Sequence, residues 1–374
     1  MRSLPCVLAL AASTFLAACG GGSGSGPEPG PEVCDNGADD DRDGIVDCAD
    51  PDCAGAAACQ TWGCGAFSAA PAGWVVSAGY RAVVIADASD GLQQPVGLTF
   101  AGGAFGPSLY VSDQAADAVW KVDVNTGAVT AFVDSKAWPV APALLTGIVW
   151  DEPGALPGSK LYVADQGADS DQTSTIYAVD AAGAATVFVA SPGPGLDDVY
   201  CMAFSPGAGY AAGLYVSGDT DGVLADWGLY AVTGAGSAFS EVAGCETAVV
   251  DREGRFGGGL LAALPLGGGY GGDGTVRRIN PDGTGAAPIA SDLGGVHGLA
   301  LTPTKGAFGG DLLAARWDAG TLLRITPAGA VSTLASGLTL TNYDANILAV
   351  PPSGSVVIVA DRNASRLVCI EPAP

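Results

Sequence analysis

The chain has 374 residues, which is enough for one large domain with small appendages. Its 15 Lys and Arg against 39 Asp and Glu give a formal net charge of −24, which argues against a nucleic-acid partner because a phosphate backbone would repel this surface. The 57 Gly and 24 Pro favour short strands and tight turns over long helices. High acidity keeps an exported protein soluble, and we expect a monomer.

Residues 1–18 are typical of a signal peptide, with Arg2 followed by an apolar run over 7–18. The run is shorter than the roughly 20 residues of a membrane-spanning helix. It ends in Leu16-Ala17-Ala18-Cys19, which resembles a bacterial lipobox. The resemblance implies cleavage before Cys19, a lipid on its sulfur and, because no Asp follows, an outer-membrane lipoprotein of the bacterial cell envelope. A plain secretory signal is the alternative.

Residues 19–33 are rich in Gly, Ser and Pro and predict a linker. An Asp- and Cys-rich segment then covers residues 34–64. Its aspartates are spaced like the ligands of an EF-hand loop, with Gly44 at the sharp turn; the five expected calcium ligands are Asp39, Asp41, Asp43, Asp47 and Asp50. Cysteines rather than helices flank the loop, so the segment resembles the metal-binding Asp/Cys-rich repeats of bacterial surface proteins. A solvated acidic spacer is the alternative.

Cysteines are expected to form disulfides because the protein is exported. Cys6 leaves with the signal peptide and Cys19 carries the lipid, which leaves eight of the ten cysteines. The local choices are Cys34–Cys48 and Cys53–Cys59, so that Cys64 is left to reach the main domain. Zinc is disfavoured because it needs reduced thiolates.

From residue 80 onward one pattern of strands recurs six times, at intervals of roughly 45–53 residues, the scale of a four-stranded propeller blade. The clearest copy is Leu109–Val133, in which strands alternate with turns. Each copy opens with an apolar strand of small residues; these lie at 96–100, 146–150, 200–204, 247–251, 297–301 and 346–350. Asp113, Asp165 and Asp361 end second strands, and we expect them to accept hydrogen bonds from turn amides.

The two ends of the repeat array favour a closed ring. The sixth copy lacks its fourth strand, and a spare strand at 82–87 precedes the first copy. We therefore predict an all-β fold, a six-bladed β-propeller over residues 65–374 closed by an N-terminal strand. Closure suggests one disulfide between Cys64 and Cys369 and another between Cys201 and Cys245, which begin neighbouring blades.

The repeats resemble the NHL and gluconolactonase-like group of six-bladed propellers. The likeness lies in Pro95-Val-Gly-Leu98, the Leu-Tyr-Val strands and the turn at 119–127. Hydrolytic members of this group bind calcium in the channel through Glu, Asn and Asp. This chain departs from them because its first blade opens with Gln93-Gln94 and lacks the expected Glu.

One residue of each inner strand is expected to ring a mouth of the channel: Val96, Thr146, Tyr200, Thr247, His297 and Asn346. With neighbouring acids, this predicts a candidate ligand site made of Asp198, Glu246, His297, Asp344 and Asn346. His297 is the one histidine of the chain; a purely structural histidine is the alternative.

We expect a membrane-anchored binding or adhesion protein with a protein or glycan ligand and no catalytic residues. The alternative is a calcium-dependent lactonase or esterase that uses the channel.

Overall fold

The computed structural model describes residues 62–151, 159–167, 174–190, 198–205, 213–218, 228–232, 241–243, 247–264, 273–341 and 346–374. It also describes the isolated residues Cys34, Asp40, Cys53, Cys59, Leu156, Gly207, Gly209, Tyr210 and Cys245.

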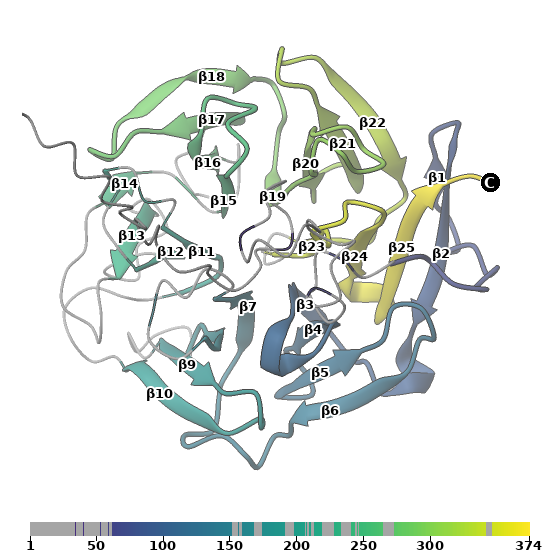
Figure 1. The fold of residues 1–374 in the computed structure, drawn as a ribbon, viewed down its shortest axis with the longest axis vertical. Helices are drawn as coiled ribbons and strands as arrows, with labels where there is room; N and C mark the ends of the chain where they lie inside the picture. Colours follow the sequence, from purple (N-terminus) through teal and green to yellow (C-terminus); the bar gives the residue numbers. More distant parts are fainter. Residues whose placement is uncertain are drawn as a thin grey trace, which may run out of the picture.

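Six antiparallel sheets of four strands or more form a ring, each a blade that points outward from a common centre (Figure 1). The first blade contains β3 (Pro95–Ala101), β4 (Ser108–Asp113), β5 (Ala118–Val122) and β6 (Val129–Val133). The second contains β7 (Leu145–Trp150), β8 (Leu161–Asp165), β9 (Thr175–Val179) and β10 (Ala185–Ala190). The third contains β11 (Met202–Phe204), β12 (Leu214–Gly218), β13 (Gly228–Val232) and β14 (Glu241–Ala243).

The remaining blades include the two strands from the start of the domain. The fourth contains β15 (Thr247–Asp251), β16 (Gly259–Leu264), β17 (Thr275–Ile279) and β18 (Gly285–Ala290). The fifth contains β19 (Val296–Leu301), β20 (Leu312–Arg316), β21 (Thr321–Ile325), β22 (Val331–Ser336) and, at its edge, β1 (Val75–Val76). The sixth contains β23 (Leu348–Ala349), β24 (Val357–Asp361), β25 (Arg366–Pro372) and β2 (Tyr80–Ala86). Short 3-10 turns lie at η4 (Ala88–Asp90), η5 (Gly103–Phe105) and η7 (Arg362–Ala364).

The predicted closure is confirmed. Strand β2 pairs antiparallel with β25 and so supplies the missing outer strand of the sixth blade. The inner strands β23 and β3 are also in contact, which joins the last blade to the first. The pairing of β1 with the outer edge of β22 is an addition that the sequence did not predict. Because the N-terminal segment covers two blade edges, fewer backbone groups are left open.

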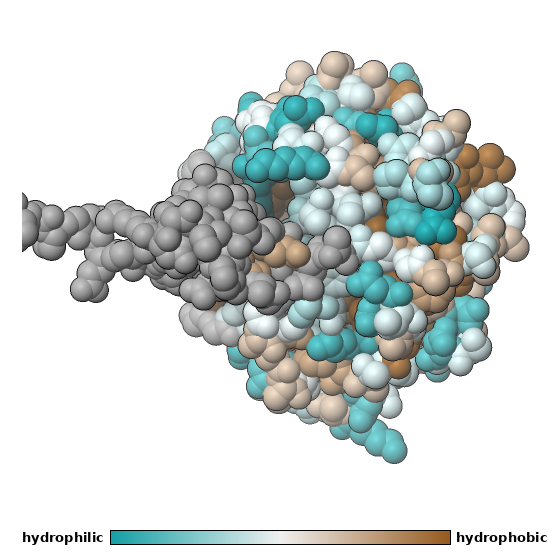
Figure 2. Space-filling model, turned by 45° about the vertical axis from the view of Figure 1, so that its right-hand side comes forward, coloured by the Kyte–Doolittle hydropathy of each residue, from teal (hydrophilic) through white to brown (hydrophobic). Residues whose placement is uncertain are grey.

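Burial falls from the centre of each blade outward. In the first blade β4 is buried throughout, whereas β6 is exposed or half-buried at every position but Val133. The middle strands are therefore near-continuous apolar runs, as expected for strands covered on both faces. Figure 2 shows hydrophilic and hydrophobic residues intermixed on the surface in view, and the large exposed apolar side chains of the described chain are four scattered valines.

Small residues recur in the inner strands because neighbouring blades meet there. A Cβ added at Gly97 would lie 2.6 Å from the Thr146 carbonyl oxygen of the next blade, and one at Gly147 would collide with the Tyr200 carbonyl oxygen. Cys201 has the corresponding place in the third blade, and its Sγ lies 3.3 Å from Thr247 Oγ1 of the fourth. A larger side chain at these positions would push the blades apart.

The aspartates that end second strands have the predicted role. Asp113 accepts hydrogen bonds from the backbone amides of Gln93 and Gln94, at 2.7 and 2.9 Å. Asp165 accepts from Leu144 N at 2.8 Å, and Asp361 from Thr339 N at 2.7 Å. In each case the carboxylate holds the chain that enters the inner strand of its own blade. These aspartates are structural.

Of the four predicted disulfides, one is confirmed and three are wrong. Cys64 is bonded to Cys369 on β25, as closure suggests. Cys34 is bonded to Cys53, so the predicted local pairs Cys34–Cys48 and Cys53–Cys59 are both wrong. Nearness in sequence was a weak guide because the entropy cost of closing a loop grows slowly with its length.

The predicted pair Cys201–Cys245 is also wrong. Both side chains are buried and no disulfide joins them. Cys201 instead fills the small-residue position between two blades, and Cys245 Sγ donates to Thr247 O at 3.5 Å. Adjacent blades bring these cysteines near one another, but each has its own packing role.

Replacing both Cys64 and Cys369 by Ser is expected to lower the melting temperature of the propeller strongly. The bond spans 305 residues, and the chain-entropy account gives such long loops about 5 kcal/mol of stabilisation at most. Thermal unfolding followed by circular dichroism measures the loss. The Cys34→Ser/Cys53→Ser pair is the control, because its bond lies outside the ring. Equal melting temperatures for the wild type and the Cys64/Cys369 variant would contradict a role of this bond in stabilising the closed ring.

Candidate functional site

A central cavity of about 270 Å³ is lined by all six inner strands. Most of its lining side chains are apolar, with Leu98, Ile148 and Leu299 among them. The polar lining side chains include Thr99, Arg252 and Asn346. Few side chains that could hold a ligand by hydrogen bonds or charge therefore reach the channel.

Most residues of the predicted ring are buried and do not line this cavity. Val96, Thr146, Tyr200, Thr247 and His297 are each at most 2% exposed, and none of them lines the cavity. Thr146 Oγ1 donates to Val199 O of the third blade at 2.6 Å. Thr247 Oγ1 lies 3.3 Å from Cys201 Sγ of the third blade, so both threonines of the ring contact a neighbouring blade.

Asn346 is the one ring residue that lines the channel. Its backbone has φ of +50°, a left-handed conformation that Asn tolerates better than most residues. Its carbonyl oxygen accepts from Leu98 N at 3.0 Å, and its Nδ2 lies 3.5 Å from Ile148 O. Asn346 Oδ1 is buried and accepts no hydrogen bond from the described residues. This oxygen is the most suitable ligand atom in the channel wall.

His297 lies within the fifth blade. Its side chain is 1% exposed and meets the ring of Trp317 edge-on, with centroids 5.8 Å apart. The imidazole is therefore enclosed by protein, and its role as a ligand stays a prediction.

The predicted ligand site is only partly described. Asp198 precedes the third blade, has φ of +50° and accepts from Gln166 Nε2 at 2.6 Å. His297 and Asn346 lie in the fifth and sixth blades. Glu246 and Asp344 lie outside the described residues, so the set as a whole stays a prediction.

Three polar residues at the blade junctions escaped the sequence reasoning. Gln114, Gln166 and Arg362 are buried, and each directly follows an aspartate that ends a second strand. Arg362 donates to Gln114 across the junction of the sixth and first blades and to Thr341 Oγ1 at 2.8 Å. A polar residue directly after the aspartate that ends a second strand is the sequence signal that would have identified them.

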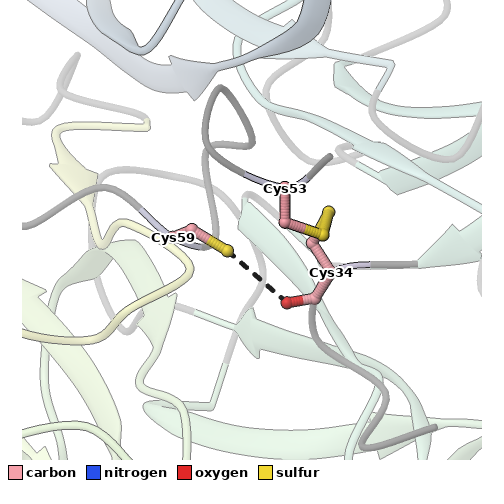
Figure 3. A group of neighbouring side chains, drawn as sticks. All are labelled: Cys34, Cys53 and Cys59. Carbon is pink, nitrogen blue, oxygen red and sulfur yellow. Dashed lines mark hydrogen bonds between the residues drawn. A yellow bond between two sulfur atoms is a disulfide. The ribbon is translucent and has the colours of Figure 1, made fainter. Parts of the chain in front are cut away.

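One group of metal-binding side-chain types comes together in the described chain, and its chemistry excludes a metal. The sulfur atoms of Cys34, Cys53 and Cys59 lie within 4.8 Å of one another (Figure 3). Cys34 and Cys53 share a disulfide, and Cys59 is also disulfide-bonded. Metal binding needs thiolates, so this group staples the segment instead.

The predicted calcium ligands Asp39, Asp41, Asp43, Asp47 and Asp50 lie outside the described residues, as do Cys19 and Cys48. In the described part of the chain, no helix is long and apolar enough to cross a membrane.

No family model and no curated protein matches the chain. Solved structures share its fold. A gluconolactonase from Xanthomonas campestris has a TM-score of 0.57 at 14% identity, covering 84% of this chain and 99% of its own. The PQQ-bound aldose sugar dehydrogenase of Streptomyces coelicolor has 0.51 at 17%, covering 79% and 99%. An auxiliary nutrient binding protein from Bacteroides ovatus has 0.50 at 15%, covering 79% and 77%. Enzymes and binding proteins thus share this six-bladed architecture.

Asp117 allows a test of the electrostatics between the first two blades. Burial, followed by the Asp165 and Asp113 carboxylates, raises the pKa of Asp117 above its ordinary value of 3.8. A raised folded pKa favours the protonated form, so this contribution to stability is present at acidic pH and lost as the pH rises. Asp117→Asn is therefore expected to raise the melting temperature by roughly 1–2 °C at neutral pH and to change it little below about pH 3.

The control is Asp282→Asn. Hydrogen bonds from Thr284 lower the pKa of exposed Asp282, so this variant should gain nothing at neutral pH. Asn also accepts the φ of +49° at Asp117. A gain at Asp117 that is equal at both pH values would assign the effect to the backbone rather than to the charge.

Proposed function

We propose that this protein is a membrane-anchored, extracytoplasmic binding protein whose propeller takes a protein or glycan ligand. The observation that carries the proposal is the burial of most residues of the predicted ring. Val96, Thr146, Thr247 and His297 are buried and do not line the central cavity. They are therefore poorly placed to act on a substrate in the channel.

Anchoring is proposed from the sequence, with Cys19 as the lipid-bearing residue and the bacterial outer membrane as the location. The calcium-binding role is proposed for the segment that carries Asp39, Asp41, Asp43, Asp47 and Asp50. The Cys34–Cys53 bond supports that role because it joins the two ends of this acidic stretch. A closed loop loses less entropy when its carboxylates converge on a cation.

A calcium-dependent lactonase or esterase is the second candidate. Two observations favour it: Asn346 Oδ1 is buried without a hydrogen bond from the described residues, and the fold is shared with a gluconolactonase. Carboxamide oxygen is a suitable calcium ligand. Of the carboxylates predicted to join it, Asp198 accepts a hydrogen bond from Gln166, and Glu246 and Asp344 lie outside the described residues.

Cys19→Ala is expected to move the protein from the membrane fraction to the soluble fraction of a bacterial host. Lipid chains on one residue give stable anchoring, and the variant has none. Immunoblotting of the separated fractions measures the shift, with Cys201→Ala as a thiol-removing control that should stay on the membrane. Unchanged fractionation of Cys19→Ala would refute anchoring through this residue.

The binding function is tested by screening the purified protein against a glycan array and, in parallel, against lactones and carboxylic esters with calcium or with chelator. We expect saturable binding to an array member and no turnover above the uncatalysed rate. Calcium-dependent turnover that falls in Asn346→Ala would replace the binding proposal with the hydrolase.

A further inference from the structure

A second cavity of about 690 Å³ lies where the inner strands of the fourth, fifth and sixth blades end. Its walls are the loops at 250–255, 301–305 and 350–353, together with Cys34. This is the end of the inner strands opposite to Asn346 and the predicted ring. The volume falls within the range of small-ligand sites.

Three cations line this cavity: Arg252, Arg255 and Lys305. They are exposed, in a chain that has only 15 Lys and Arg against 39 acidic residues. The side chains of Arg252 and Lys305 make no hydrogen bond or ion pair with any of the described residues. The guanidinium of Arg255 makes one long hydrogen bond, to Gly309 O at 3.4 Å. Asp251 and Glu253 also line the cavity, but among the described residues no ion pair joins either carboxylate to these three cations. Such a concentration of cations needs an explanation in so acidic a protein.

The carboxylates in the same loops accept hydrogen bonds from backbone amides. Asp251 is 3% exposed and accepts from the amides of Arg255, Phe256 and Gly258, at 3.1, 2.7 and 2.9 Å. Glu253 accepts from Thr304 N at 3.0 Å and so ties the loops of the fourth and fifth blades together. The carboxylates thus fix the loops while the cations face the cavity.

The rest of the lining suits a hydroxyl-rich ligand. Thr304 and Ser353 offer hydroxyl groups, and Pro351 and Pro352 form an apolar side. Arg252 lines both this cavity and the central channel, so it lies at the inner end of the space. A ligand with a carboxylate at that end and hydroxyls along its length would satisfy these groups.

We propose that this cavity binds an acidic saccharide, with Arg252 and Lys305 receiving a carboxylate. The proposal rests on the binding function proposed above and names its ligand class and its face of the propeller. Because the cations are partly solvated, the attraction weakens as salt screens it.

The experiment is isothermal titration of the full chain with trigalacturonate, at low and high salt, beside maltotriose as the neutral saccharide and triglutamate as the acidic peptide. We expect trigalacturonate to bind, more weakly at high salt, and the other two to bind at least tenfold less well. Losing a hydrogen-bonded charge costs a factor of about ten to a hundred in affinity. Arg252→Glu and Lys305→Glu should each show a loss in that range.

Lys136→Glu is the matched control, since Lys136 is exposed in another blade and the charge change is the same. Equal affinity in Arg252→Glu and wild type, preference for triglutamate, or no binding of trigalacturonate would each overturn the proposal. A neutral array glycan that binds wild type and Arg252→Glu alike would overturn this site and leave the binding function standing. Absence of any array ligand would count against the binding function itself.

Discussion

The close approach of neighbouring inner strands is the constraint on which the propeller depends. At Gly97 and Gly147 there is no space for a Cβ, because the backbone of the next blade lies there. Such junctions hold the blades close together around the channel. The residue before the small position can be carried into the junction, which explains why Thr146 bonds to the third blade. Most of the residues from which a channel site would be built are therefore buried and do not line the channel.

The chemistry that remains therefore lies in the loops at the two ends of the channel, and the two ends differ. At the start of the inner strands, Gln166 and Asp198 bond to each other, and Arg362 bonds to Gln114 and Thr341. These polar groups bond across blade junctions, whereas Asn346 Oδ1 accepts no hydrogen bond from the described residues. At the opposite end, Arg252 and Lys305 have no such partners among the described residues, and a larger cavity opens beside them. A paired network stabilises the fold, whereas uncompensated charge beside open space is what a ligand site requires.

Much of the fold could be predicted from the sequence, because comparison of the repeats shows which strand of each blade is present and which is missing. The spare strand at 82–87, the missing last strand and the position of Cys369 were enough to predict the β2–β25 pairing and the bond to Cys64. The roles of Asp113, Asp165 and Asp361 followed from their place at strand ends. The wrong predictions depended on distances between residues of different blades, and a repeat pattern does not determine those distances. The sequence shows that Cys201 and Cys245 are near neighbours but not that Cys201 fills a junction. Arg252 and Lys305 lie in loops of different blades, so nothing in a linear pattern connects them.

The N-terminal segment approaches the propeller on the same side as the basic cavity. Trp62 packs edge-on against Phe100 at the end of β3, and its carbonyl oxygen accepts from Ser355 Oγ at 2.7 Å. Cys34 lines the cavity itself. If Cys19 bears the lipid, the linker of roughly 20 Å joins the membrane to this side of the ring. The cavity then lies beside the tether, within reach of envelope polymers close to the membrane. The Cys64–Cys369 bond joins the segment before β2 to the third strand of the sixth blade, so a force on that segment acts on two paired strands instead of separating β2 alone.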